Sequence, residues 1–221
     1  MTTLHEEMKR CGICGFESEY TGIGSTNCMG SNDLDTRPPE MERSTIFAWV
    51  QRCPNCGFCN SDVSKTMKSA QLSIDRQDYK DQLNDPAYPT LANSFLCTAI
   101  FYRGRGVLSR STWGLIHAAW ACDDADKPEQ AGICRKKAAA TLVFGQENDQ
   151  TISSNDRSNA AILVDLLRRS GQAEQAREVL ATQTDITGAD VISRVLTFQS
   201  VLLGRNDVSC HTVAEALGES Q

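Results

Sequence analysis

The sequence predicts an α+β fold with a small β module at residues 1–62, a helix and linker at 63–90, and an all-α domain of helical hairpins at 91–221. The composition changes near residue 62. Six of the ten cysteines and most short β-branched or aromatic runs lie before it, whereas apolar residues recur with helical spacing after it. The aromatic content of 6% suits helices that pack through small residues better than a large sheet core.

The phrase C-x-x-C-G-aromatic occurs twice, at residues 11–16 and 53–58. Two thiolates on one tight turn can face a single metal ion, and two such turns supply the four sulfurs of a tetrahedral site. Gly15 and Gly57 allow each chain to curl back toward its sulfurs. The spacing therefore predicts one metal ion bound by Cys11, Cys14, Cys53 and Cys56. Buried thiols or a redox dithiol are the alternatives.

The ion expected at this site is a structural Zn²⁺, because four thiolates leave no open position for water or substrate. Iron in the same four sulfurs, as in an electron carrier, is the alternative. Cys28 and Cys59 are the remaining cysteines of the module, and neither forms a second C-x-x-C pair. We expect both to be free thiols.

The β-branched and aromatic run Thr45–Arg52 predicts a strand that leads into the second cysteine pair. A helix is expected over Asp62–Leu83, with Leu72, Tyr79 and Leu83 near one face, and Pro86 follows as its stop signal.

Antiparallel helix pairs are expected from residue 91 onward. Trp113, Ile116, His117 and Trp120 form an apolar stripe at helical spacing. Pro128 suits a first-turn position, and Gly171 marks a helix end. The expected helices cover residues 91–103, 111–122, 128–144, 156–170, 173–182, 189–203 and 209–217.

Residues 160–180 resemble a tetratricopeptide repeat, in which a glycine turn and small residues let two helices pack closely. An ordinary helical bundle is the alternative. Paired helices of the repeat kind leave a groove lined by the first helix of each pair. The polar or amphipathic residues expected on or near that groove are Asn93, Tyr102, Arg103, His117, Asn159 and Arg168.

The formal net charge of −6 argues against nucleic-acid binding, which depends on neutralising phosphates with Lys and Arg. We expect a protein or peptide partner of neutral or basic character. No apolar run reaches membrane-spanning length, and the first residues lack a basic-then-apolar signal segment. A cytoplasmic protein with reduced thiols and no membrane association is therefore expected.

One segment suggests an enzyme instead. Asp33, Asp35 and Arg37 lie close together in the insert between the two cysteine pairs. The two aspartates would form an acidic pair beside the metal, with Arg37 as the anchor for an anionic substrate and His5 or His117 as a further member of the site. An Asx turn with a surface ion pair is the simpler interpretation. No nucleophile–base pair is legible in the sequence, so the protein is more easily read as a non-enzyme.

Three phrases carry a resemblance to a known family: residues 33–39 (DLDTRPP), 49–57 (WVQRCPNCG) and 118–124 (AAWACDD). They resemble a bacterial family, known as a domain of unknown function, that joins an N-terminal paired-C-x-x-C, zinc-ribbon-like module to a tetratricopeptide-like helical part. The resemblance implies a fold and no activity. The two cysteine turns are also similar to those of rubredoxin, where the same turn holds iron, although a rubredoxin is much shorter and its cysteine pairs lie closer together.

Overall fold

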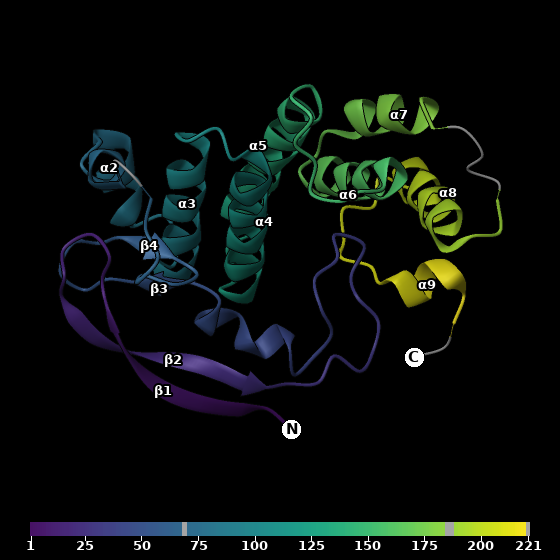
Figure 1. Cartoon of the computed structure of the whole chain (residues 1–221). Coiled ribbons are helices and arrows are strands. Elements are labelled where there is room, and N and C mark those ends of the chain that lie inside the picture. The colour runs from purple at the N-terminus through teal and green to yellow at the C-terminus, as the bar shows by residue number, and fades with distance from the viewer. Residues whose placement is uncertain (68–69, 184–187, 220–221) are drawn as a thin grey trace.

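A computed structural model describes residues 1–67, 70–183 and 188–219. Small antiparallel strand pairs at the N-terminus precede a helical region, so the α+β class is confirmed. In Figure 1 the N-terminal hairpin runs along one side of the helices. Among the described residues, no helix combines the length and the apolar character that crossing a membrane requires.

Within the described residues, four strands form two separate antiparallel pairs. Strand β1 (Thr3–Arg10) pairs with β2 (Glu17–Ser25), and the shorter β3 (Gln51–Arg52) pairs with β4 (Cys59–Asn60). Each pair is closed by one of the two cysteine turns, at residues 11–16 and 53–58. Both turns are therefore hairpin connections, which fixes the direction in which each one presents its sulfurs.

The helices pack mainly against their neighbours in the chain. Helices α2 to α5 stand side by side in chain order, and α6 to α9 form a second group beyond α5 (Figure 1). The helix bounds are α1 Ala70–Ile74, α2 Gln77–Leu83, α3 Thr90–Arg103, α4 Leu108–Asp124, α5 Pro128–Gln146, α6 Asp156–Arg169, α7 Ala173–Ala181, α8 Val191–Gly204 and α9 Val213–Leu217.

Helices α3 and α4 approach closely because small residues lie between them. A Cβ atom added at Gly114 of α4 would lie 3.0 Å from the carbonyl oxygen of Phe95 and 3.1 Å from the Cβ of Ala99 on α3. Ala118, Ala119 and Ala121 continue the buried side of α4. The low aromatic content is thus matched by close packing of helix backbones.

The expected strand over Thr45–Arg52 is wrong. Residues Arg43–Ala48 form the 3-10 helix η1, and only Gln51 and Arg52 are extended. The Thr45 hydroxyl donates to the Glu42 carbonyl, and the Trp49 indole N–H donates to that hydroxyl at 2.9 Å. These local bonds, with the burial of Thr45 and Ile46, override the strand preference of β-branched residues.

The single helix expected over Asp62–Leu83 is also wrong. The Asp62 side chain accepts from the Ser64 backbone N–H and hydroxyl, and it holds residues 61–64 in a turn. Helix follows only in α1 and α2, and residues 68–69 of the expected helix lie outside the described part. Tyr79 is fully buried, whereas Leu72 is 70% exposed and does not share its environment.

From residue 90 onward the expected helices are present, with ends that differ by a few residues. Their caps explain the boundaries. Asn155 and Asp190 accept backbone N–H groups at the starts of α6 and α8. Thr212 and Glu215 form a reciprocal capping box at the start of α9, which begins four residues later than expected. Gly171 ends the first helix of the α6–α7 pair with φ of +75°.

Candidate metal centre

The first cysteine turn connects β1 to β2. The Cys11 backbone N–H donates to the Phe16 carbonyl at 2.9 Å, and the Gly15 N–H donates to the Cys11 carbonyl at 2.9 Å. Gly15 has φ of +73°, a left-handed conformation that residues with a Cβ atom adopt at a cost. The result is a tight turn with Cys11 and Cys14 on one side.

The second cysteine turn repeats this geometry between β3 and β4. The Cys53 N–H donates to the Phe58 carbonyl at 2.8 Å, and the Gly57 N–H donates to the Cys53 carbonyl at 2.9 Å. Gly57 has φ of +75°. Repetition of sequence has therefore produced repetition of backbone conformation, as the spacing predicts.

The two turns bring their sulfurs together. The sulfur of Cys11 lies 3.8 Å from that of Cys56, and the sulfur of Cys14 lies 3.6 Å from that of Cys53. All four Sγ atoms lie within 4.8 Å of one another. Zn–S bonds of about 2.3 Å give a tetrahedron with edges of about 3.8 Å. The four-cysteine cluster is therefore a possible metal site, and its spacing suits one ion held tetrahedrally by four thiolates.

The cluster lies at the edge of the protein. Cys11 and Cys53 are buried, Cys56 is partly buried and Cys14 is exposed. Burial opposes ionisation of Cys14, but hydrogen bonds to Asn55 and the Phe16 backbone outweigh it and lower its pKa to about 6. Burial raises the pKa of Cys56. A bound divalent cation deprotonates the thiols that coordinate it. Its positive charge would therefore keep all four cysteines as thiolates, although their pKa values differ without it.

Helices α2 and α3 hold the second turn in place. The Tyr79 hydroxyl donates to the Gly57 carbonyl at 3.1 Å and accepts from the Cys59 N–H at 2.9 Å. Phe58 is fully buried against Phe101, with ring centroids 5.2 Å apart. The four-cysteine cluster is thus anchored to the helical region through its second turn.

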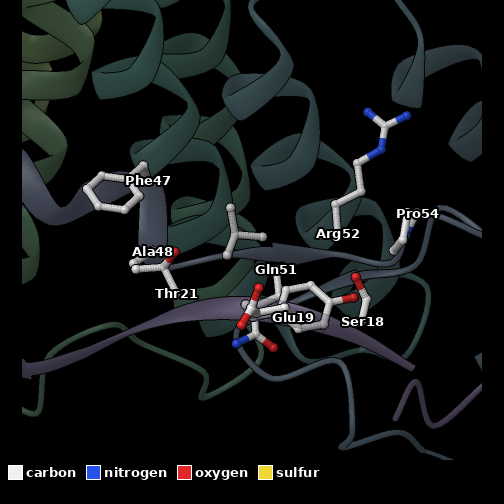
Figure 2. A pocket seen from close by; sticks show the side chains of 10 residues that line it. Ser18, Glu19, Thr21, Phe47, Ala48, Gln51, Arg52 and Pro54 are labelled. Atoms are coloured by element: carbon white, nitrogen blue, oxygen red, sulfur yellow. The ribbon is translucent and has the colours of Figure 1, made fainter. Parts of the chain in front are cut away.

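A hollow of about 290 Å³ lies beside this turn, between β2 and residues 47–54 (Figure 2). Glu19 and Gln51 contribute polar side chains to its lining. Arg52 extends from it toward the helices and donates to the Leu83 carbonyl and the Asn84 side chain. Its guanidinium is therefore committed to the end of α2.

The other cysteines stay outside the cluster. Cys28 is exposed and Cys59 is buried, and neither belongs to the four-cysteine group. Cys59 lies near Cys97 of α3, and Cys122 lies near Cys134 of α5. The Cys59 thiol donates to the Gly57 carbonyl at 3.3 Å and the Cys97 thiol to the Tyr79 carbonyl at 3.6 Å. These pairs were not legible in the sequence, because their members come from separate elements.

Asp33, Asp35 and Arg37 are all buried, and each has a different partner. Asp33 accepts from Arg43 at 2.7 Å, and Arg37 donates to both carboxylate oxygens of Asp124 at 2.6 Å. The surface ion pair and the shared anion site that the sequence suggested are both absent from the described residues. Arg37 and Asp35 instead attach the insert to the helices, whereas the Asp33 carboxylate pairs with Arg43 inside the insert.

Asp35 is the centre of that attachment. It is fully buried and accepts from the Trp120 indole at 2.8 Å and from Arg169 of α6 at 3.0 Å. Arg169 also donates to Asp123 at 3.1 Å, and Asp123 in turn pairs with Arg135 of α5. A buried charge network therefore joins the insert to three helices. His5 lies on β1, and the His117 ring packs against Trp120 without a hydrogen bond to Asp35 among the described residues.

Most of the polar residues expected on a groove are buried and bonded within the protein, although Tyr102 and His117 do line a hollow of about 240 Å³. Asn93 bonds Gln82 and the Asp85 carbonyl, and Asn159 bonds the Ser153 carbonyl. Arg168 is 1% exposed and pairs with Asp165 at 2.6 Å. Tyr102 is also buried, its hydroxyl donating to Asn60. Only Arg103 is exposed and His117 partly so. Polar members of these helices satisfy one another inside the protein.

Comparison with protein-family models, curated proteins and solved structures found no significant match. The suggested family and rubredoxin resemblances thus have no support from these comparisons, and the functional argument depends on the four-cysteine cluster and its surroundings.

Proposed function

We propose that the protein binds one Zn²⁺ through Cys11, Cys14, Cys53 and Cys56, in a zinc-ribbon-like module that includes residues 1–62. The observation that carries the proposal is the convergence of two matching cysteine turns, with all four sulfurs within 4.8 Å. Separations of 3.6 and 3.8 Å across the two turns agree with the edge of about 3.8 Å expected for tetrahedral zinc.

The role proposed for the ion is structural. Four thiolates complete its coordination, and an ion of this kind contributes about 10–16 kcal/mol of apparent binding free energy to folding. It would hold the β1–β2 turn against the β3–β4 turn. A two-stranded hairpin alone is only marginally stable in water. The ion would therefore stabilise the β1–β2 hairpin by linking it to the second turn.

We infer a protein-interaction role for the helical part, residues 91–221, with residues 63–90 as its connection to the module. The α6–α7 pair supports a tetratricopeptide-like unit. Gly171 turns the chain with φ of +75°, Ala176 is fully buried, and Leu180 is 7% exposed at the contact. The net charge of −6 favours a protein or peptide partner of basic character over nucleic acid, in a cytoplasmic setting.

X-ray absorption at the metal edge of the purified protein tests the site. The proposal expects zinc with four sulfur neighbours at about 2.3 Å. A red protein whose main metal is iron would support an electron carrier instead. Zinc with three sulfurs and a lighter ligand would mean an open coordination position and contradict a purely structural role.

A further inference from the structure

All three tryptophans of the chain surround one histidine, and one of them, Trp49, comes from a distant part of the sequence. His117 of α4 lies with its ring centroid 5.3 Å from that of Trp49, which follows η1. Trp113 and Trp120, also on α4, lie at 5.7 and 5.0 Å from it. Phe95 of α3 completes the group at 5.2 Å.

A cleft of about 580 Å³ opens on these rings. We call it the tryptophan cleft, and its walls include Thr36, Glu42, Trp49, Trp113, His117 and Trp120. A second hollow of about 240 Å³ shares Trp49, Trp113 and His117 with it and extends to Tyr102 and Arg110. The Arg110 guanidinium is held there by the Tyr102 hydroxyl, to which it donates at 2.8 Å. The two hollows therefore adjoin across the same rings and offer room for more than one side chain.

The polar groups of the tryptophan cleft favour a cation. Glu42 is its one charged lining residue among those described, and its carboxylate has no hydrogen-bond or ion-pair partner within that part of the chain. The Trp113 indole N–H likewise has no recorded partner in the described part of the chain, whereas Trp49 and Trp120 use theirs on Thr45 and Asp35. Burial lowers the pKa of His117 to about 4, so its ring brings no positive charge at neutral pH.

Aromatic faces attract cations, and one of these rings already does so. The Arg37 guanidinium lies 5.9 Å from the ring centroid of Trp120, within the range of a cation–π contact. Trp49 and Trp113 are only partly buried, and no such contact is recorded for them within the described residues. They are the surfaces left for a ligand.

We propose that the tryptophan cleft binds the side-chain ammonium of a lysine on a partner polypeptide, against Trp49 and Trp113 and paired with Glu42. The adjoining hollow accommodates the residue next to that lysine. A free small cation would leave this hollow empty. The acidic net charge of the chain favours approach of a basic segment. This inference goes beyond the metal site and does not depend on which metal is bound.

The test is to titrate the metal-loaded protein with three probes and to measure binding by tryptophan fluorescence and calorimetry. The probes are an acetylated, amidated Gly-Ala-Lys-Ala-Gly peptide, the same peptide with norleucine in place of lysine, and n-butylammonium. Norleucine keeps the apolar stem and removes the charge. We expect the lysine peptide to bind about tenfold more tightly than the norleucine peptide, and butylammonium to bind more weakly than the lysine peptide.

Matched variants locate the site. Glu42→Gln and Trp113→Leu should each weaken the lysine peptide about three- to tenfold. Glu40→Gln removes the same charge two residues away, on a different cavity, and should leave binding unchanged. Metal content and circular dichroism of each variant show whether a loss comes from the cleft or from unfolding.

Three results would overturn the proposal. Equal binding of the lysine and norleucine peptides would show that the site is apolar. No binding of either peptide at 10 mM, which corresponds to a binding free energy of about 3 kcal/mol or less, would show that there is no site. Butylammonium binding as tightly as the lysine peptide would replace the polypeptide partner by a free small cation.

Discussion

The indole N–H of Trp120 donates to the carboxylate of Asp35 over 2.8 Å, although 85 positions separate the two residues. The contact joins the insert of the cysteine-rich module to helix α4, and Arg169 of α6 approaches the same carboxylate oxygen. The segment that looked like a catalytic cluster in the sequence is therefore a buried attachment point. It sets where the module sits on the helices.

Removing the Asp35 carboxylate should destabilise the protein strongly. Asp35→Ala leaves the buried Arg169 guanidinium without one of its charge partners and the Trp120 N–H without an acceptor. We expect a loss of about 3–5 kcal/mol in the free energy of unfolding, measured by urea titration. Glu178→Gln, at an exposed position of α7, is the control and should stay within about 0.5 kcal/mol. If Asp35→Ala lowered the free energy of unfolding by no more than the control does, the charge network would not stabilise the fold.

The two turn glycines should respond unequally to the same substitution. Both have positive φ, so alanine strains either backbone by about 1–2 kcal/mol. A Cβ at Gly57 would also lie 2.3 Å from Leu83 Cδ2, whereas one at Gly15 meets only the Arg10 side chain at 3.4 Å. Gly57→Ala should therefore cost at least about 1 kcal/mol more than Gly15→Ala in unfolding measurements. Equal costs would mean that Leu83 does not press on the second turn.

His117 should titrate far below an ordinary histidine. Burial lowers its pKa to about 4 in the folded protein, while the unfolded value is about 6.5. Because the unfolded state binds the proton more readily, this group's contribution to stability is complete above pH 6.5 and falls as the pH drops toward 4. NMR titration of the ring protons should give a midpoint near pH 4.

The same linkage predicts a stability difference. At pH 5 the wild type should have lost about 2 kcal/mol through this histidine relative to pH 7.5, a loss that His117→Gln lacks. Comparing the two proteins at both pH values removes the contributions of all other groups. A ring midpoint near 6.5, or parallel losses in both proteins, would show that His117 is solvated.

The predictable parts of this protein are those encoded by short spacing. The two C-x-x-C-G turns fix their own backbone through adjacent hydrogen bonds, and helices such as α4 follow from a repeating apolar stripe. Residues 43–48 show the limit, because the Thr45 hydroxyl and the Trp49 indole make local bonds that strand propensity does not anticipate.

Long-range partners lay outside what the sequence could reveal. Arg37 donates to Asp124, which lies 87 positions away in the sequence, and Arg169 donates to Asp35, which lies 134 positions away. A polar residue inside an apolar helix can be a groove residue or one half of a buried pair, and only the packed fold distinguishes the two, as Arg168 and Asp165 illustrate. The gathering of the three tryptophans around His117 has the same origin, since Trp49 comes from a different element from Trp113 and Trp120.

The central claim is that the four cysteines bind one zinc ion, and the most direct test is the metal content per chain, measured by inductively coupled plasma mass spectrometry. Wild-type protein and Cys28→Ser, which alters an exposed thiol outside the cluster, should each hold one zinc per chain. Cys14→Ser, at the most exposed ligand, and Cys53→Ser, at a buried one, should each lose most of it, because each removes a thiolate from a four-sulfur site. Wild type without metal, or both ligand variants with zinc undiminished, would contradict the account.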